Sequence, residues 1–400
     1  MKRKRISVSM IALALMLTGC LAGFHHGAMA AESGPAIPEL KPTKKEMPDN
    51  EGLRRVWEMK AGWNLGNTFD AVDCAWLSNP LDYETAWCGA RTEEVLMDGL
   101  RDAGFKTIRV PVSWHNHVDE NLTIDEAWLA RVREVVSWAL ERDLFVILNI
   151  HHDCEKGFYY PSRENAERSE RYVRTIWTQL AETFRDTGDR LMFECINEPR
   201  LKGTDHEWWW EATDPACQEA MAEIIRLNQV FVDTVRGAGG ENESRFLLVP
   251  AYDASPDYAC DPAFTLPVDT VENRMIVSVH AYSPYSFALE QPGTERFDRN
   301  NAEHQAGITG FLDALYHRFI SNGIPVLIGE FGAMEKNGNL QSRVDWMAFY
   351  VSQARARGMT CCWWDNNLFS GKGERFGLFD RKTGECRIPE LLETFMKHCE

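Results

Sequence analysis

Short apolar runs alternate with longer amphipathic stretches along most of this chain, and this alternation constrains the fold more than any other feature of the sequence. Near-continuous apolar runs of this length favour strands of a parallel sheet that is covered on its outer face. The pattern predicts eight strands, at 62–66, 107–112, 144–150, 191–197, 245–251, 275–281, 324–330 and 359–364.

Helical patterns lie between most of these runs, whereas the stretch 252–274 is rich in Asp and Pro and is expected to be mostly loop. Gly104, Gly237 and Gly358 stand where three of the helices should end. Eight strand–helix repeats indicate an α/β protein with a single (β/α)8 barrel, also called a TIM barrel, over residues 51–400. The helices are predicted at 92–103, 125–142, 165–187, 217–238, 303–322 and 340–358.

Residues 1–30 have the pattern of a signal peptide, with a basic start followed by a short apolar run. A lipobox ending at Cys20 would lipidate that cysteine, and an A-x-A site would instead allow cleavage after Ala30. Both readings predict export, to the periplasm, the cell envelope as a lipid-anchored protein, or the medium. Residues 31–50 contain four prolines and are expected to form a spacer.

Composition limits the partners. The formal net charge is −17, so the chain repels phosphate backbones and nucleic acid is not an expected partner. The 14 tryptophans and 10 tyrosines belong mostly in a large core, and a minority can serve as flat platforms for a hydroxyl-rich ligand such as a sugar. We expect a monomer.

Ten cysteines remain beyond Cys20, and an even number in an exported protein favours disulfides. Short spacing suggests two pairs, Cys74–Cys88 and Cys386–Cys399. Connectivity of the others does not follow from sequence.

Polar residues follow the predicted strands at the ends where TIM barrels carry their active sites. Two of them, Glu198 and Glu330, end the fourth and seventh strands, and their carboxylates can converge across the barrel mouth. Paired carboxylates are the apparatus of glycoside hydrolysis, although a single glutamate after a strand more often caps a helix or forms a salt bridge. The full set is Asn67, Asp70, Arg109, His151, His152, Asn197, Glu198, His280, Tyr282, Glu330 and Trp364.

Other interpretations concern the histidines and tryptophans. His151 and His152 suit a metal site, but the neighbouring strand ends supply poor ligands, so we expect no metal and no other cofactor. Adjacent Trp363 and Trp364 should point to opposite faces of their strand, one into the core and one into the site. The Trp208–Trp210 run is equally compatible with core cover and with a sugar platform.

Seven ordered motifs then resemble glycoside hydrolase family 5, and most closely its endoglucanase-rich subfamily 4. The resemblance covers residues 52–400. The motifs are GWNLGNTFDA (62–71), RVPVSW (109–114), LNIHHD (148–153), FECINEPR (193–200), VSVHAYSPY (277–285), LIGEFG (327–332) and WWDN (363–366). The resemblance implies a retaining, metal-independent hydrolase on a (β/α)8 barrel.

The resemblance assigns Glu198 in INEP as the acid/base and Glu330 in GEFG as the nucleophile. It gives the remaining family-wide site positions to Arg109, His151, Asn197, His280, Tyr282 and Trp364, and subsite shaping to Asn67, Asp70 and His152. Ala281 in VHAY departs from the aromatic expected before the tyrosine.

These roles carry physical expectations. Arg109 and Tyr282 should keep Glu330 ionised, whereas Glu198 should have a raised pKa so that it holds a proton. Asn197 can donate to a sugar 2-hydroxyl, and the two carboxylates should lie roughly 5–5.5 Å apart, as in retaining enzymes.

The expected substrate is an extended β-1,4-glucan cleaved at internal bonds. Xyloglucan, mixed-linkage glucan (lichenase activity), mannan and xylan are alternatives within the family. Two other classes stay open, a metal-dependent barrel hydrolase and a non-catalytic polysaccharide-binding protein.

Overall fold

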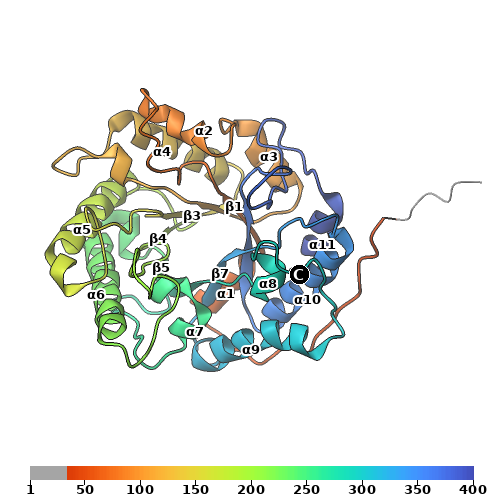
Figure 1. The fold of residues 1–400 in the computed structure, drawn as a ribbon. Coiled ribbons are helices and arrows are strands. Elements are labelled where there is room, and N and C mark those ends of the chain that lie inside the picture. The colour runs from red at the N-terminus through yellow and green to blue at the C-terminus, as the bar shows by residue number, and fades with distance from the viewer. Residues whose placement is uncertain (1–33) are drawn as a thin grey trace, which may run out of the picture. The chain divides into compact units, whose positions relative to one another are not determined.

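Eight parallel strands close into a barrel in the computed structural model, which describes residues 34–400 (Figure 1). The predicted signal peptide, with Cys20, lies outside the described residues. Each strand pairs with the next, and β1 pairs with β8, which closes the ring. The strands are β1 (Ala61–Leu65), β2 (Thr107–Val110), β3 (Phe145–Asn149), β4 (Leu191–Glu194), β5 (Leu247–Pro250), β6 (Met275–His280), β7 (Val326–Phe331) and β8 (Thr360–Asp365). All eight predicted strands and the single barrel are confirmed.

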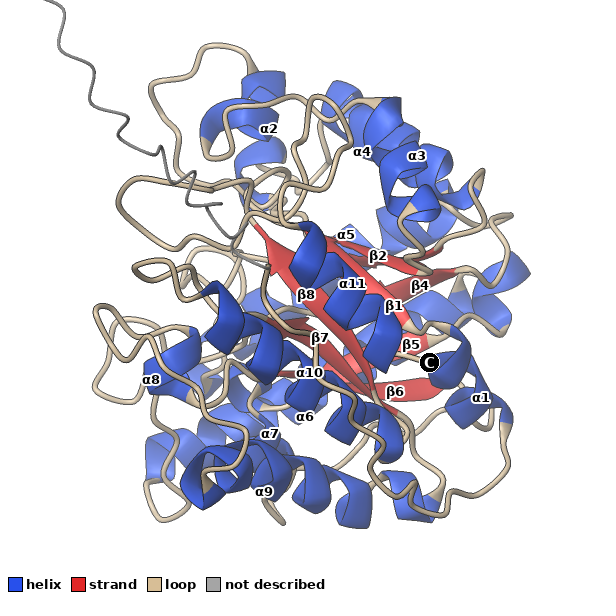
Figure 2. Ribbon diagram, turned by 90° about the vertical axis from the view of Figure 1, so that its right-hand side faces the viewer, coloured by secondary structure: helices blue, strands red, loops and turns tan. Residues whose placement is uncertain are grey.

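Helices surround the barrel, with the tilted strands at the centre (Figure 2). The six predicted helices are confirmed as α3, α4, α5, α6, α9 and α10. The segment predicted as mostly loop holds two short elements, a 3-10 helix at Tyr252–Ala254 and the four-residue helix α7. The helices are α1 (Glu51–Glu58), α2 (Tyr83–Ala86), α3 (Glu94–Asp102), α4 (Glu126–Leu140), α5 (Ala166–Thr183), α6 (Pro215–Gly237), α7 (Pro256–Ala259), α8 (Tyr285–Ala288), α9 (Ala302–Arg318), α10 (Leu340–Ala356) and α11 (Pro389–His398).

Two of the predicted helix stops act as expected. Gly104 and Gly358 follow α3 and α10 with φ of 99° and 84°, a left-handed conformation that glycine adopts without strain. Gly237 is instead the last residue of α6, and the left-handed position is Gly239, with φ of 72°.

The inside of the barrel changes from apolar to polar along its axis. At the end of the barrel where the strands begin, inward side chains such as Ile147 and Leu248 pack with Val56 in α1 and with Met59, which follows this helix. Helix α1 therefore closes that end of the barrel. One layer higher the inward residues are polar and fully buried: Asn64, Arg109, Asn149, Glu194 and Ser278. Buried polar groups need partners, and these residues form the floor of the site described below.

Residues 35–50 contain no helix or strand and run along the outside of the barrel. The backbone N–H of Lys45 donates to the Ala356 carbonyl at 2.8 Å, and Tyr316 donates its hydroxyl to the carbonyl of Glu46 at 2.7 Å. These contacts attach the proline-containing segment to α10 and α9. Within residues 34–400, no helix has the length and apolar character needed to cross a membrane.

Neither expected disulfide is formed, because all ten cysteines that the structure describes are free. The thiols donate to nearby backbone carbonyls instead: Cys74 to Val72 at 3.3 Å and Cys399 to Met396 at 3.3 Å. The two predicted disulfides rest only on short spacing along the chain. Such spacing does not determine whether two cysteine side chains face each other.

Candidate active site

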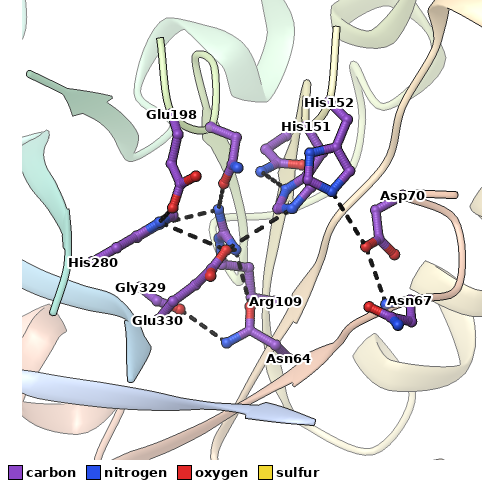
Figure 3. A network of polar contacts seen from close by, with 12 residues as sticks. Asn64, Asn67, Asp70, Arg109, His151, His152, Glu198, His280, Gly329 and Glu330 are labelled. Carbon is purple, nitrogen blue, oxygen red and sulfur yellow. Dashed lines mark hydrogen bonds and ion pairs between the residues drawn. The ribbon is translucent and has the colours of Figure 1, made fainter. Parts of the chain in front are cut away.

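Arg109 on β2 is the centre of the polar layer and is fully buried. Its Nε and Nη1 atoms lie 2.7 Å from Oε2 of Glu194 and 2.7 Å from Oε1 of Glu330. Its Nη2 donates to Oδ1 of Asn197 at 2.7 Å, and Nη1 also donates to Asn64 at 3.0 Å. Burial lowers the pKa of a guanidinium, but the two carboxylates outweigh it and raise the pKa of Arg109. The cation is therefore held between Asn64 and Glu330 (Figure 3).

Glu194 on β4 holds this cation from below. Its oxygens accept hydrogen bonds from Asn149 Nδ2 at 2.9 Å and from the Ser278 hydroxyl at 2.5 Å. Sequence reasoning did not identify Glu194 as part of the site. The signal was present, because an acid inside the apolar run LMFECIN requires a buried partner.

A β-bulge aims Glu330 into the barrel. Val279 pairs with Ile328, and the next pair is His280 with Glu330, so Gly329 is an extra residue in β7. A Cβ at Gly329 would lie 3.0 Å from Ser278 Oγ and 3.3 Å from His280 Nε2, so a side chain there would crowd both neighbours. Oε2 of Glu330 accepts a hydrogen bond from the Tyr282 hydroxyl at 2.9 Å.

Glu198 lies in the segment that follows β4, and its Oε1 lies 2.8 Å from Nδ1 of His280. Burial would raise the pKa of Glu198, but the hydrogen bond and charge of His280, together with the charge of Arg200, lower it to about 2. The structure therefore does not agree with the expected raised pKa of Glu198. Sequence reasoning overlooked Arg200, whose Nη1 lies 3.4 Å from Oε2 of Glu198.

The two carboxylates lie close together. One oxygen of Glu198, one oxygen of Glu330 and one ring nitrogen of His280 all lie within 4.8 Å of each other. This separation is closer to the roughly 5–5.5 Å of retaining glycosidases than to the roughly 6.5–9.5 Å of inverting ones.

His151 and Trp364 form one wall. Their rings are stacked, with centroids 5.8 Å apart and an interplanar angle of 5°. Nδ1 of His151 lies 3.1 Å from the Asn149 amide nitrogen, which donates, so the ring hydrogen is on Nε2, 3.9 Å from Oε1 of Glu330. Burial lowers the pKa of His151 well below its usual range, and this ring is neutral.

Asn67 and Asp70 lie to one side of the two glutamates (Figure 3). Asp70 is fully buried and accepts backbone N–H groups from Asn67 at 3.0 Å and Thr68 at 2.7 Å. Nε2 of His152 lies 3.8 Å from Oδ2 of Asp70. Burial raises the pKa of Asp70 to about 7 despite these hydrogen bonds, and burial lowers the pKa of His152 to about 4.

An open cleft of about 1210 Å³ lies over this network. Nine of the eleven predicted site residues line it, and the other two, Arg109 and Asp70, lie beneath its surface. Further lining residues that sequence reasoning missed are Trp87, Arg200, Asp253, Tyr285 and Glu374.

The tryptophan alternatives are now resolved. Trp363 is fully buried and Trp364 lines the cleft, as strand alternation predicted. The Trp208–Trp210 run divides: Trp210 is buried and donates to the Cys217 carbonyl at 2.8 Å, whereas Trp208 and Trp209 are 58% and 71% exposed and line the cleft.

Two groups in the site have donor atoms close enough to share a cation, Asp70 with His151 and His152, and Glu198 with His280 and Glu330. Most of these donors already have partners. Asp70 accepts two backbone N–H groups, and Glu330 is paired with Arg109. A cation in either group would have to displace contacts that hold the network together.

Comparison with known proteins agrees with this geometry. The sequence profile of the family described as Cellulase (glycosyl hydrolase family 5) matches residues 70–370. The cellulase/esterase CelE of Acetivibrio thermocellus is 37% identical over 98% of this chain, which spans about half (47%) of that protein's length. Endoglucanase B of Ruminococcus albus is 38% identical over 86% of this chain and 80% of its own length.

Solved structures are also similar to this chain in sequence and in fold. A family 5 lichenase from Caldicellulosiruptor sp. F32, in complex with cellotetraose, is 50% identical with a TM-score of 0.90, over 92% of this chain and all (100%) of that one. A GH5-4 broad-specificity endoglucanase from Ruminococcus champanellensis, with bound cellotriose, is 41% identical with a TM-score of 0.81, over 88% of this chain and 100% of that one.

Proposed function

This chain belongs to glycosyl hydrolase family 5, and on that basis we propose that it is a retaining endo-β-1,4-glucanase with Glu330 as nucleophile and Glu198 as acid/base. The observation that carries the proposal is the pair of carboxylates whose oxygens approach within 4.8 Å across the cleft. This spacing leaves room for a sugar carbon between them but not for the additional water that an inverting enzyme needs.

In the first step, Glu330 attacks the anomeric carbon and Glu198 protonates the leaving oxygen. Arg109 at 2.7 Å and the Tyr282 hydroxyl at 2.9 Å donate to the two oxygens of Glu330 and fix its orientation. A covalent glycosyl-enzyme results. In the second step, water attacks this intermediate while Glu198 accepts the proton.

His280 supplies the proton that Glu198 needs to act as an acid. The low pKa of Glu198 means that this carboxylate is ionised, and its partner His280 carries the hydrogen on Nδ1. Glu330 and Glu198 raise the pKa of His280 against the effect of burial. A bound sugar excludes water and places the leaving oxygen beside Glu198, and the proton of the His280–Glu198 pair can then move to that oxygen through Glu198.

Asn197 and Trp364 position the sugar. Arg109 occupies Oδ1 of Asn197, so the amide Nδ2 is available to donate to a sugar hydroxyl. The Trp364 ring lines the cleft and offers an apolar surface for a pyranose.

The substrate class rests on the open cleft and on the relatives. The exposed rings of Trp208, Trp209 and Tyr285 line the cleft and suit stacking along an extended chain. Several relatives are named endoglucanases, and one similar structure holds cellotriose. The 50% identity to a lichenase favours mixed-linkage β-glucan as a second substrate. Xyloglucan follows, since a xyloglucanase from Paenibacillus pabuli is 30% identical.

Hydrolysis of carboxymethylcellulose and a panel of polysaccharides, with and without EDTA, tests the proposal. We expect activity on β-1,4-glucan and mixed-linkage glucan, EDTA-insensitive turnover, and β-anomers as first products by NMR. No activity would indicate a sugar-binding protein, EDTA-sensitive turnover a metal-dependent hydrolase, and α-anomers an inverting mechanism. Glu198→Gln should slow substrates with poor leaving groups far more than activated aryl glycosides, whose departure needs no proton.

Export is a separate part of the proposal and is supported by the signal-peptide pattern at residues 1–30. Lipidation at Cys20 and cleavage after Ala30 predict different products. Palmitate labelling of the full chain in a bacterial host, lost on Cys20→Ser, would indicate the lipid anchor, and a mature chain beginning at Ala31 would indicate the A-x-A site.

A further inference from the structure

Three side chains of different chemistry converge where the segment after β4 meets the first turn of α6. His206, Asp214 and Cys217 each offer one ligand atom, and these atoms all lie within 4.8 Å of one another. None of the three lines the catalytic cleft, and none belongs to the motifs that carried the family resemblance. The proposed hydrolysis gives them no role.

His206 is oriented as a metal-binding imidazole is. Its Nδ1 lies 3.1 Å from the backbone carbonyl of Trp209, which can only accept, so the ring hydrogen is on Nδ1. Nε2 therefore presents its lone pair on the other side, toward Asp214. Histidines that bind metals almost always donate their other nitrogen to a carbonyl or carboxylate in this way.

Asp214 divides its two oxygens between two tasks. Oδ1 caps α6 by accepting the backbone N–H groups of Ala216 at 2.8 Å and Cys217 at 3.1 Å. Oδ2 lies 3.5 Å from Nε2 of His206. That distance is long for a hydrogen bond, but two ligands of one tetrahedral zinc, each bonded at about 2.0–2.1 Å, are separated by about 3.4 Å.

Cys217 adds sulfur to this nitrogen and oxygen pair. Its side chain is buried, while those of His206 and Asp214 are 26% and 30% exposed, so water can reach the place where the three donors meet. A mixed imidazole, carboxylate and thiolate set suits zinc better than magnesium or calcium, which prefer oxygen. We propose that His206, Asp214 and Cys217 bind one zinc ion, with water as the fourth ligand and the Cys217 thiol deprotonated on binding.

The position of the site suggests a structural role. Trp208 and Trp209, which line the cleft with exposed rings, lie between His206 and Asp214 in the chain. A zinc ion bound to residues on both sides would fix the ends of this tryptophan segment. The reaction at Glu198 and Glu330 does not pass through the metal, so this inference stands or falls independently of the proposed hydrolysis.

Cobalt titration of the full chain tests the site, since Co²⁺ replaces Zn²⁺ and its thiolate complex absorbs in the near ultraviolet. The protein is stripped with chelator, kept reduced without added thiols, and titrated with Co²⁺ and then Zn²⁺. We expect one equivalent of Co²⁺, a thiolate charge-transfer band, and displacement by Zn²⁺. Cys217→Ser should abolish the band, and His206→Ala and Asp214→Asn should each weaken binding by at least about tenfold.

Two comparisons make the result decisive. Cys260→Ser removes a half-buried thiol outside the group and should leave the band unchanged. His206→Ala changes a partly exposed residue, so it decides the question if Cys217→Ser fails to fold. No saturable binding, a band that survives Cys217→Ser, or binding that is lost in His152→Ala and retained in His206→Ala would overturn the proposal.

Discussion

Nδ1 of His280 lies 2.8 Å from Oε1 of Glu198 (Figure 3). The same nitrogen lies 3.7 Å from Oε1 of Glu330, so one imidazole contacts both carboxylates of the candidate site. His280 therefore controls whether Glu198 is protonated or ionised.

Replacing His280 by Asn should raise the pKa of Glu198 from about 2. The change removes the imidazole charge that favours the carboxylate, and burial, which favours the neutral acid, then has more weight. NMR titration of ¹³C-labelled glutamate carboxyls measures the shift, with Glu198→Gln assigning the resonance. An unchanged titration of Glu198 would show that His280 does not set its charge.

The Arg109–Glu194 pair should be a major source of stability beneath the site. Both side chains are fully buried, and Glu194→Gln leaves the guanidinium with less compensation. Breaking a buried ion pair costs about 3–5 kcal/mol. We expect a loss of this order in urea unfolding, together with reduced turnover because Arg109 loses its anchor. Glu120→Gln, at an exposed position, is the matched control. A loss under about 1 kcal/mol would contradict a structural role for the pair.

Asp70 should make stability fall as the pH rises from about 4 to about 7. Its folded pKa is raised from 3.8 to about 7 by burial, so between these values the folded state holds a proton that the unfolded state has lost. The folded state therefore loses stability relative to the unfolded state as pH increases. Asp70→Asn removes this titration. From pH 4 to pH 7 the unfolding free energy of the wild type should therefore decrease relative to that of the variant. A difference between the two proteins that stays constant with pH would contradict the raised pKa.

Trp209 should contribute to binding of long chains without affecting chemistry. It lines the cleft and is 71% exposed. Trp209→Ala should raise KM several-fold on soluble β-glucan, since stacking on an aromatic ring contributes about 1 kcal/mol, and should leave kcat on an aryl cellobioside nearly unchanged. Trp76→Ala is the control, because Trp76 is 73% exposed and does not line the cleft. Equal effects of the two variants would exclude a platform at Trp209.

Much of the fold was predictable because the strands and helices carry clear periodicities. The eight apolar runs are typical of strands that are buried on both faces of a parallel sheet. The polar residues that follow these strands gather at one end of a parallel barrel. The same reasoning predicts that Glu198, Glu330 and His280 lie close together. Short helices such as α2 and α8 were not predicted, since four-residue elements carry no periodic signal.

The missing parts of the site depend on contacts between distant segments. His280 reaches Glu198 from β6 and Arg200 follows Glu198 by two residues, and a linear pattern does not show the positive charge that these contacts bring to Glu198. The pKa of Glu198 was mispredicted for this reason. The β-bulge at Gly329 also left no sequence signal beyond a glycine in GEFG. Asp70 was expected to shape the substrate cleft, yet it lies beneath the surface and holds the turn that presents Asn67.

In the proposed mechanism Glu330 forms a covalent bond with the sugar. Replacement by Ala should abolish turnover with the fold intact, and azide should partly restore cleavage and yield an α-glycosyl azide.

Trapping tests the claim most directly. The enzyme is incubated with an activated 2-deoxy-2-fluoro-β-cellobioside, digested, and mapped by mass spectrometry. We expect one fluorocellobiosyl group per chain on the peptide containing Glu330, with loss of activity in step with labelling. Labelling of another carboxylate, or complete turnover without any covalent intermediate, would contradict it.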